Sequence, residues 1–315
     1  MINLNYIKFI EIMNEGVKEG EELSRHTSFK IGGKADLFYS AKDENSLIKA
    51  VKTAKFLNIP TVIIGDGSNI LVSDKGYRGV VVKNRCRGEI KIFNKNKIIV
   101  YSGFQLSEVL KFAAEHSLSG LEFAAGIPGS VGGAVYMNAG AFGSSIGELT
   151  VQGNVIDKNG NIHKLNKKDF EFGYRSSRLQ KSDEILISVI LKLVKGEKEK
   201  ILQKMNKIIG IRKGKHPAKN IPCAGSYFRN IVKEDLDITG EPAGYYLEKA
   251  GTKKLRAGDA AVFDKHANFI VNVGNAKSSD VLKLAKMMKR KVKEMFGIEL
   301  VEEVVYLDDE EGFKR

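Results

Sequence analysis

Residues 125–143 read AGIPGSVGGAVYMNAGAFG, and residues 65–72 read GDGSNILV directly after the apolar run at 61–64. Glycine has no side chain, so backbone N–H groups in such loops can approach a ligand closely and together form an anion-binding nest. Glycines also mark tight turns at sheet corners, and either loop alone is as readily explained in that way. Two such loops, each with Ser and Asn side chains among its glycines, favour phosphate binding.

Neither loop is one of the common phosphate-binding motifs. The first has Ile70 where the third glycine of a dinucleotide-binding fingerprint would stand, and the chain has no glycine-lysine-serine or glycine-lysine-threonine run. The phosphate-binding scheme is therefore a different one.

The composition indicates a soluble chain with an excess of positive charge. Its 315 residues, 43% of them hydrophobic, are enough for two or three domains. The 51 Lys and Arg residues exceed the 38 Asp and Glu residues, giving a net charge of +13, which suits nucleic acid, an anionic membrane surface or a small anionic substrate. Cys86 and Cys223 lie far apart without a CxxC pair, and no leader or apolar run of about 20 residues is present. We expect a cytoplasmic protein.

Short β-branched runs alternate with helical periodicity, which is typical of α+β or α/β architecture. The pattern predicts helices over 44–57, 106–116, 197–213 and 281–296. It predicts strands over 61–64, 80–82, 98–101, 185–193 and 300–307, and a hairpin over 151–165 that turns at Asn159-Gly160.

Both glycine loops, together with FKIGG at 29–33, resemble the UDP-N-acetylenolpyruvoylglucosamine reductase family over about residues 23–307. The resemblance implies a flavin enzyme that completes UDP-N-acetylmuramate for bacterial cell-wall synthesis. It implies an α+β fold of the vanillyl-alcohol-oxidase/PCMH type, with FAD between two subdomains and a C-terminal α+β substrate domain. We expect an N-terminal segment at 1–28, an FAD-binding domain at 29–196 that is split near 83–85, and a substrate-binding domain at 197–315.

The resemblance also implies which residues contact FAD and which carry the chemistry. The cofactor-binding candidates are Gly33, Gly65, Gly67, Ser68, Asn69, Gly126, Gly129, Ser130, Gly132 and Asn138. The motifs GYRSSR at 173–178, AGSYFRN at 224–230 and GIELVEEV at 297–304 map the family's catalytic residues onto Arg175, Ser226 and Glu303.

These three residue types suit reduction of an enol ether. Hydride transfer from flavin N5 to the methylene carbon spreads negative charge into the adjacent carboxylate. Arg175 can hold that carboxylate with its fork of donors, and Glu303 can polarise it from the other side. Ser226 can then protonate the α-carbon as a general acid, assisted by Lys215.

Each residue also has an ordinary explanation. Outside its motif, Arg175 would suit a structural ion pair and Ser226 a turn hydroxyl. Glu303 stands beside Glu302, and strand alternation lets only one of the pair face the site. We assign the role to Glu303 because it precedes Val304, as in the family.

Tyr174, Lys215 and Asn230 are substrate-binding candidates by position in the motifs, although Lys215 also suits a solvated lysine and Tyr174 a core aromatic. The chain departs from the family at Arg229, where lysine is common, and at Ile231 and Glu302, where proline is common. Only 51 positions separate Arg175 from Ser226, so the chain resembles the short class, which lacks an additional tyrosine-bearing loop.

We therefore expect FAD and NADPH as cofactors, a UDP-sugar enol ether as substrate, and a monomer without membrane insertion. Another flavin oxidase or dehydrogenase of the same fold group remains an alternative. A basic nucleic-acid-binding protein is the non-enzyme alternative, but no nucleic-acid-binding motif supports it. The five histidines have no metal-ligand spacing, so no metal is expected.

Overall fold

The computed structural model describes residues 3–157, 160–231 and 241–314, which divide into two compact units. Unit 1 comprises residues 1–19, 37–66 and 79–212, and unit 2 comprises residues 20–36, 67–78 and 213–315. The strands β1 (Val17–Glu22), β2 (Lys34–Ala41) and β5 (Tyr77–Asn84) each begin in one unit and end in the other. With β3 (Thr61–Ile64) they form a sheet of order β1-β2-β5-β3, in which β3 and β5 are parallel.

Unit 1 is built on a second sheet of order β12-β11-β13-β7-β6, whose neighbouring strands are antiparallel. Its strands are β6 (Lys91–Phe93), β7 (Lys97–Tyr101), β11 (Thr150–Ile156), β12 (Ile162–Asn166) and β13 (Ile185–Lys192). These bounds confirm the predicted hairpin of β11 and β12. The predicted turn includes residue 159, which lies outside the described residues.

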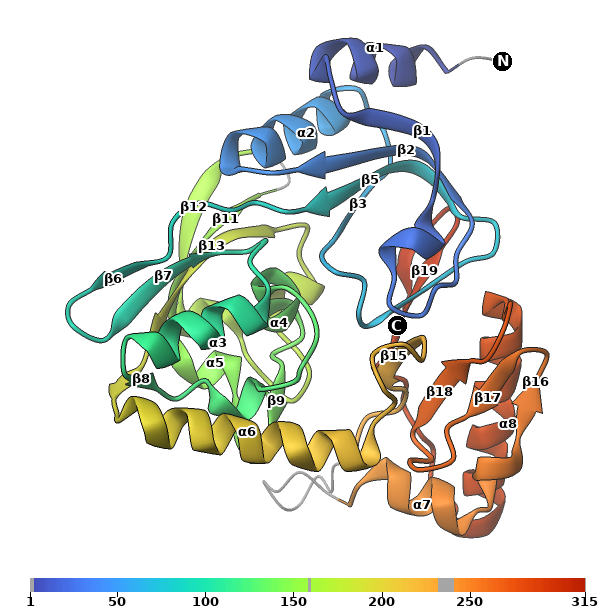
Figure 1. Ribbon diagram of the computed structural model, residues 1–315. Coiled ribbons are helices and arrows are strands. Elements are labelled where there is room, and N and C mark those ends of the chain that lie inside the picture. Colours follow the sequence, from blue (N-terminus) through green and yellow to red (C-terminus); the bar gives the residue numbers. More distant parts are fainter. Residues whose placement is uncertain (1–2, 158–159, 232–240, 315) are drawn as a thin grey trace. The chain divides into compact units, whose positions relative to one another are not determined.

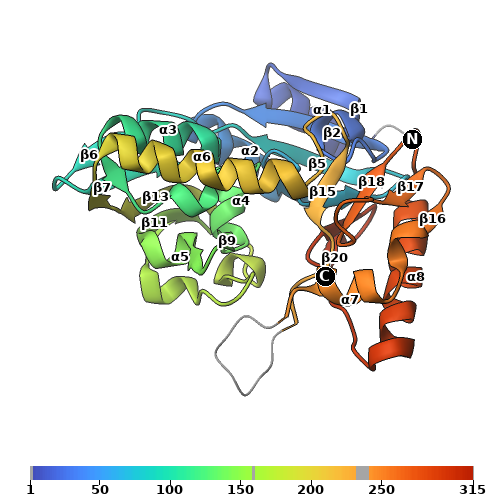
Figure 2. The same cartoon turned by 60° about the horizontal axis from the view of Figure 1, so that its bottom comes forward.

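Unit 1 also contains the helices from α1 to α6 (Figure 1). They are α1 (Leu4–Met13), α2 (Glu44–Phe56), α3 (Leu106–Glu115), α4 (Val131–Tyr136), α5 (Ile146–Leu149) and α6 (Lys198–Lys215). Short strands β8 (Leu118–Ser119), β9 (Gly140–Ala141), β10 (Ser144–Ser145) and β14 (Val194–Lys195) connect them. Leu110 of α3 and Ile208 of α6 pack into one core with Val189 of β13, and Figure 2 shows both helices from a second direction. The helix α2 lies where it was predicted, and Asp43 caps its N-terminus, since its side chain accepts a hydrogen bond from Ser46 N.

Unit 2 packs a long helix, α8 (Ser278–Phe296), against an antiparallel sheet of order β15-β18-β17-β16 (Figure 1). The strands are β15 (Cys223–Ser226), β16 (Arg256–Ala257), β17 (Ala260–Val262) and β18 (Phe269–Asn272), and a short helix α7 (Ala243–Lys249) lies between β15 and β16 in the chain. Gly297 ends α8 with a φ of 68°, the conformation predicted for a glycine that follows a helix. A smaller sheet of order β20-β19-β4 contains β4 (Ile70–Val72), β19 (Val305–Asp308) and β20 (Gly312–Lys314).

The predicted strand at 300–307 is wrong over its first half, because regular pairing begins only at Val305. Glu302 forms an isolated bridge with Phe228, and Glu303 N donates to Tyr227 O at 2.7 Å. The backbone of this segment is thus bonded to the chain that follows β15, and only from Val305 onward does it pair with β4. No helix in the described part of the chain is long and apolar enough to cross a membrane.

Candidate active site

In unit 1, the end of β3 lies against the second glycine loop. A Cβ atom at Gly65 would lie 2.3 Å from Ser130 Oγ, which is far inside van der Waals contact. Ser130 begins α4, and its Oγ accepts a hydrogen bond from Gly133 N at 3.2 Å. Only glycine at position 65 leaves room for this serine, so the two glycine loops depend on each other for their shape.

The structure narrows the set of amides that the second loop can offer to a ligand. Val131 N and Gly132 N donate to Phe104 O and Ser102 O, each at 2.8 Å. By contrast, the amides of Gly126, Gly129 and Ser130 make no hydrogen bond within the described residues. Three donors that lie close together in sequence therefore remain available for an anion.

Substitution of Gly65 tests this arrangement. Gly65→Ala should displace Ser130, lower the free energy of unfolding by about 1–3 kcal/mol, and weaken the retention of FAD. Gly133→Ala is the matched control, because its Cβ would lie 3.5 Å from the same Ser130 Oγ, an ordinary contact. Urea unfolding and flavin fluorescence on dilution measure the two effects. Equal flavin retention by the two variants would contradict the role given to Gly65.

The loop that carries Arg175 is held tightly in unit 1. Gly173 and Ser176 bond to each other through their backbones at 3.1 and 3.2 Å, and Gln180 Nε2 donates to Arg175 O at 3.1 Å. Arg175 itself has a φ of 51°, the left-handed region that non-glycine residues rarely adopt. Its guanidinium lies 5.1 Å from the ring centroid of Tyr174. Strain held in place by several hydrogen bonds is typical of a residue whose side chain must point in one direction.

Asn138 connects this loop to the second glycine loop. Its Nδ2 donates to Gly173 O at 2.8 Å, and its Oδ1 accepts from Gly147 N at 2.9 Å. The side chain is buried and bonded at both ends. These contacts favour a positioning role for Asn138 beside the Arg175 loop.

An ion pair between a partly exposed arginine and a buried carboxylate stabilises the far end of the same loop. Arg178 donates to both carboxylate oxygens of Glu184, at 2.8 and 3.1 Å, and His163 contacts the same carboxylate at 3.0 Å. Burial raises the pKa of Glu184, but hydrogen bonds from Arg178 and Ser182 outweigh it and hold that pKa below its ordinary value.

This shift predicts a pH-dependent stability. Because the folded-state pKa of Glu184 is depressed, its contribution is complete above the ordinary glutamate pKa and is lost as the pH falls through the folded-state value. Glu184→Gln should lower the free energy of unfolding by about 1–3 kcal/mol at neutral pH, and the difference from wild type should shrink in acid. Urea unfolding across a pH series measures this, with the exposed neighbour Asp183→Asn as control. If the difference in unfolding free energy between wild type and Glu184→Gln grew in acid, the pKa of Glu184 would not be depressed in the folded state.

In unit 2, Ser226 and Glu303 lie on neighbouring segments. Ser226 ends β15 and pairs with Phe269 of β18, while the next residue, Tyr227, accepts the hydrogen bond from Glu303 N. Asn69 of the first glycine loop fixes the second segment, because its Nδ2 donates to Glu303 O at 3.0 Å and its carbonyl accepts from Val305 N at 3.0 Å. Asn69, which is more than 150 positions from either residue in sequence, thus bonds to the segment that lies beside the end of β15.

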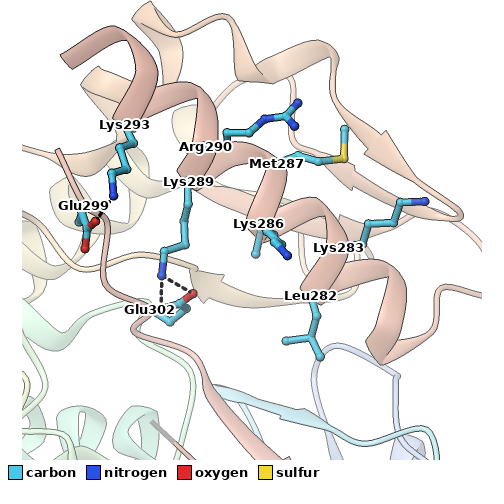
Figure 3. A pocket seen from close by; sticks show the side chains of 10 residues that line it. Leu282, Lys283, Lys286, Met287, Lys289, Arg290, Lys293, Glu299 and Glu302 are labelled. Carbon is cyan, nitrogen blue, oxygen red and sulfur yellow. Dashed lines mark hydrogen bonds and ion pairs between the residues drawn. The ribbon is translucent and has the colours of Figure 1, made fainter. Parts of the chain in front are cut away.

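The two neighbouring glutamates have different surroundings. Glu302 accepts two hydrogen bonds from Lys289 Nζ of α8, at 3.0 and 3.1 Å (Figure 3). This pair lines a groove of about 540 Å³ along α8, whose lining includes none of the predicted site residues. Glu302 is therefore engaged in an ion pair with α8.

Other site candidates in unit 2 have structural partners or line a second pocket. A Cβ at Gly33 would lie 2.3 Å from Asp74 O, and one at Gly67 would lie 2.2 Å from His26 O, so close backbone packing requires both glycines. Lys215 lines a pocket of about 230 Å³ together with His266, and burial followed by the charge of Lys215 lowers the pKa of His266. Asn230 Oδ1 accepts a long hydrogen bond of 3.4 Å from Ala243 N.

The predicted site residues fall into two groups. Unit 1 holds Gly65, Gly126, Gly129, Ser130, Gly132, Asn138, Tyr174 and Arg175. Unit 2 holds Gly33, Gly67, Ser68, Asn69, Lys215, Ser226, Asn230 and Glu303. No cluster of three or more His, Cys, Asp or Glu side chains that could hold a metal occurs among the described residues.

Arg212 lies against the second glycine loop, and the sequence did not single it out. A Cβ at Gly126 would lie 2.9 Å from its Cδ, and its Nε is buried without a hydrogen bond. In the sequence it is one of many cations on a basic helix, and its neighbours along the chain carry no sign of its burial.

Comparisons with known proteins find relatives along nearly the whole chain. The family described as "FAD binding domain" matches residues 35–166, and "UDP-N-acetylenolpyruvoylglucosamine reductase, C-terminal domain" matches residues 216–307. The chain is 39% identical to UDP-N-acetylenolpyruvoylglucosamine reductase of Clostridium tetani, over 94% of both chains. It is 41% identical to that of Caldanaerobacter subterraneus, over 94% of this chain and 96% of the relative.

A solved structure is also similar along most of the chain. The crystal structure of the Thermus caldophilus UDP-N-acetylenolpyruvylglucosamine reductase is 33% identical and matches with a TM-score of 0.75. The match covers 91% of this chain and 98% of that structure. On this evidence, the chain belongs to the UDP-N-acetylenolpyruvoylglucosamine reductase family of FAD-dependent oxidoreductases.

Proposed function

We propose that Arg175, Ser226 and Glu303 carry the chemistry by which this chain reduces UDP-N-acetylglucosamine enolpyruvate to UDP-N-acetylmuramate with NADPH. The observation that carries the proposal is the pairing of the chain after Ser226 with the segment of Glu303, fixed by Asn69. That pairing joins two of the three motifs and one glycine loop.

The residues of unit 1 fit FAD. Three free amides in the second glycine loop suit a diphosphate, Gly65 keeps the loop close to β3, and the buried Nε of Arg212 lacks a partner. FAD, when bound, takes a hydride from NADPH and supplies it to the methylene carbon of the enol ether.

The chain's own residues control the charge and the proton in this reaction. Arg175 binds the substrate carboxylate through two parallel N–H donors and stabilises the charge that grows there. We assign to Glu303 the polarisation of the substrate carboxylate. Ser226 then donates its hydroxyl proton to the α-carbon and recovers a proton afterwards, with Lys215 as the nearby cation that makes the hydroxyl a better acid. Tyr174 and Asn230 line the substrate-binding region.

We also propose the structural class, the oligomeric state and the location of the chain. The chain belongs to the short class without the additional tyrosine loop. It acts as a monomer in the cytoplasm, in keeping with its free thiols Cys86 and Cys223. Light scattering coupled to gel filtration tests the monomer.

The adjacent glutamates give a matched test of the mechanism. Glu303→Gln should lower kcat at least about tenfold, equivalent to about 1.4 kcal/mol of transition-state stabilisation. Glu302→Gln should leave kcat nearly unchanged, because it breaks only the partly exposed pair with Lys289. Steady-state kinetics of both variants decide which of the two glutamates acts in catalysis. A larger loss of kcat in Glu302→Gln would refute the assignment of Glu303.

A further inference from the structure

A tight turn at residues 27–31 overlaps the FKIGG motif and has no part in the proposed mechanism. Lys30 N donates to Thr27 O at 3.4 Å, and Thr27 Oγ1 donates to Ile31 O at 3.2 Å. Lys30 has a φ of 58°, in the left-handed region, and Ile31 is buried in the core of unit 2. Hydrogen bonds within the turn and apolar packing therefore fix the place of Ser28.

Ser28 joins this turn to two other segments. Its Oγ donates to Cys223 O at 2.6 Å, although the two residues are 195 positions apart. Its backbone N donates to Gly67 O at 3.1 Å. The hydroxyl also lies 3.4 Å from Gly67 O, but it has a single proton and the shorter contact takes it. Ser28 thus connects the first glycine loop to the first residue of β15.

β15 is an edge strand, and Ser28 bonds to the side of it that the sheet leaves open. The sheet order is β15-β18-β17-β16, so β18 pairs with one side of β15 (Figure 1). On that side Asn272 N donates to Pro222 O at 2.9 Å. On the other side no strand in the described part of the chain pairs with β15, and the hydrogen bond from Ser28 to Cys223 O takes that place. The strand is therefore anchored on both sides at its beginning.

Between that beginning and the proposed general acid, β15 contains a bulge. Cys223 pairs with Val271 and Ser226 with Phe269, so three steps along β15 stand opposite two along β18. Gly225 lies inside the irregular stretch with a φ of 80°. A bulge changes the direction in which neighbouring side chains point. The direction of the Ser226 hydroxyl therefore depends on how firmly the bulge is held.

Asn268 fixes the far end of the bulge. Tyr227 N donates to Asn268 O at 2.8 Å. The buried Asn268 side chain accepts from Phe228 N at 2.9 Å and donates to Phe228 O at 2.8 Å. At the near end, the corresponding side-chain hydrogen bond comes from Ser28.

We propose that Ser28 is a positioning residue for the protonation step, because its hydrogen bond to Cys223 O holds the bulge that aims the Ser226 hydroxyl. This proposal rests on the function proposed above, which makes Ser226 the general acid. Ser28 itself transfers no proton. A displacement of about 1 Å in a reacting group can cost about 10²-fold in rate, so loss of this one hydrogen bond should slow protonation about tenfold.

The test measures the two half-reactions of flavin-loaded Ser28→Ala by stopped-flow absorbance. Reduction by NADPH should stay within about twofold of wild type, whereas reoxidation by the enolpyruvyl UDP-sugar should slow about tenfold. The solvent deuterium isotope effect on reoxidation should rise, because proton delivery then limits that step more strongly.

A double variant separates positioning from a general loss of structure. If Ser28 acts through Ser226, adding Ser28→Ala to Ser226→Ala should slow reoxidation no further, because the hydroxyl that it positions is already absent. Independent effects would multiply instead, so multiplied losses in the double variant would overturn the proposal.

Three further variants make the result specific. Ser28→Thr keeps the hydroxyl and should recover most of the reoxidation rate. Ser28→Cys has a weaker donor of similar size, so it should be intermediate, and it replaces Ser28→Ala if that variant does not fold. Ser24→Ala removes a half-buried hydroxyl of the same unit that makes no hydrogen bond with a described residue, and it should match wild type.

The outcomes distinguish failure of this inference from failure of the proposed function. Unchanged reoxidation in Ser28→Ala, or equal slowing of both half-reactions, would refute the inference alone if Ser226→Ala is slow in reoxidation. Weaker retention of FAD with normal reoxidation of the loaded protein would mean that Ser28 serves only the first glycine loop, and would refute it too. Normal reoxidation in Ser226→Ala would refute the function proposed for Ser226 itself.

Discussion

Replacement of Ser226 by alanine should slow the oxidation of the reduced cofactor by the enolpyruvyl substrate by about 10²–10⁴-fold, the range of a positioned general acid. Reduction by NADPH should stay nearly intact, because that half-reaction needs no proton at the substrate α-carbon. Ser226 ends β15 and is held by pairing with Phe269, so loss of its hydroxyl removes the proton donor and leaves the strand in place. Stopped-flow absorbance of the flavin measures each half-reaction separately.

The control lies on the same strand. Cys223→Ala changes another partly buried side chain of β15 and should leave both half-reactions close to wild type. Equal losses in the two half-reactions of Ser226→Ala would show that the serine supports binding or folding and does not act as an acid.

Arg175→Met should lower kcat/KM by about 10²–10³-fold, the range measured when a donor to a developing negative charge is removed. Arg175→Lys should recover only part of this loss, since lysine keeps the charge but cannot bind a carboxylate through two parallel donors. Both variants should still be reduced by NADPH. Steady-state kinetics with the UDP-sugar, and flavin reduction in its absence, make the comparison.

A second cation in the same loop provides the control for Arg175. Lys181 is exposed, and Lys181→Met should retain wild-type kcat/KM. If Lys181→Met lost as much kcat/KM as Arg175→Met, the loss would come from the net charge of the loop. The paired N–H donors of the Arg175 guanidinium would then not explain it.

Sequence patterns predicted the secondary-structure elements that depend mainly on neighbouring residues. The apolar spacing predicted α2, and the amphipathic run before Gly297 predicted α8. The strand expected from residue 300 begins at Val305 instead. Its first residues bond to the chain after β15, which lies more than 70 positions away, and a period-2 pattern carries no information about such a partner.

The candidate site shows the same division between local and long-range information. Glycine-rich motifs located both loops, yet only the structure shows which amides in the second loop are already bonded and why Gly65 cannot bear a side chain. Asn69 and Asn138 were predicted to contact the cofactor by position in a motif. Their side chains hold the Glu303 segment and the Arg175 loop, contacts that depend on tertiary folding. Arg212 was missed because its burial arises from the loop that packs over α6.

Anaerobic stopped-flow of the purified wild-type protein tests the central claim most directly. We predict that NADPH bleaches the bound flavin and that UDP-N-acetylglucosamine enolpyruvate restores the oxidised spectrum, with one UDP-N-acetylmuramate formed for each NADPH consumed. A flavin that NADPH does not bleach, or that stays reduced when the enolpyruvyl sugar is added, would contradict the account.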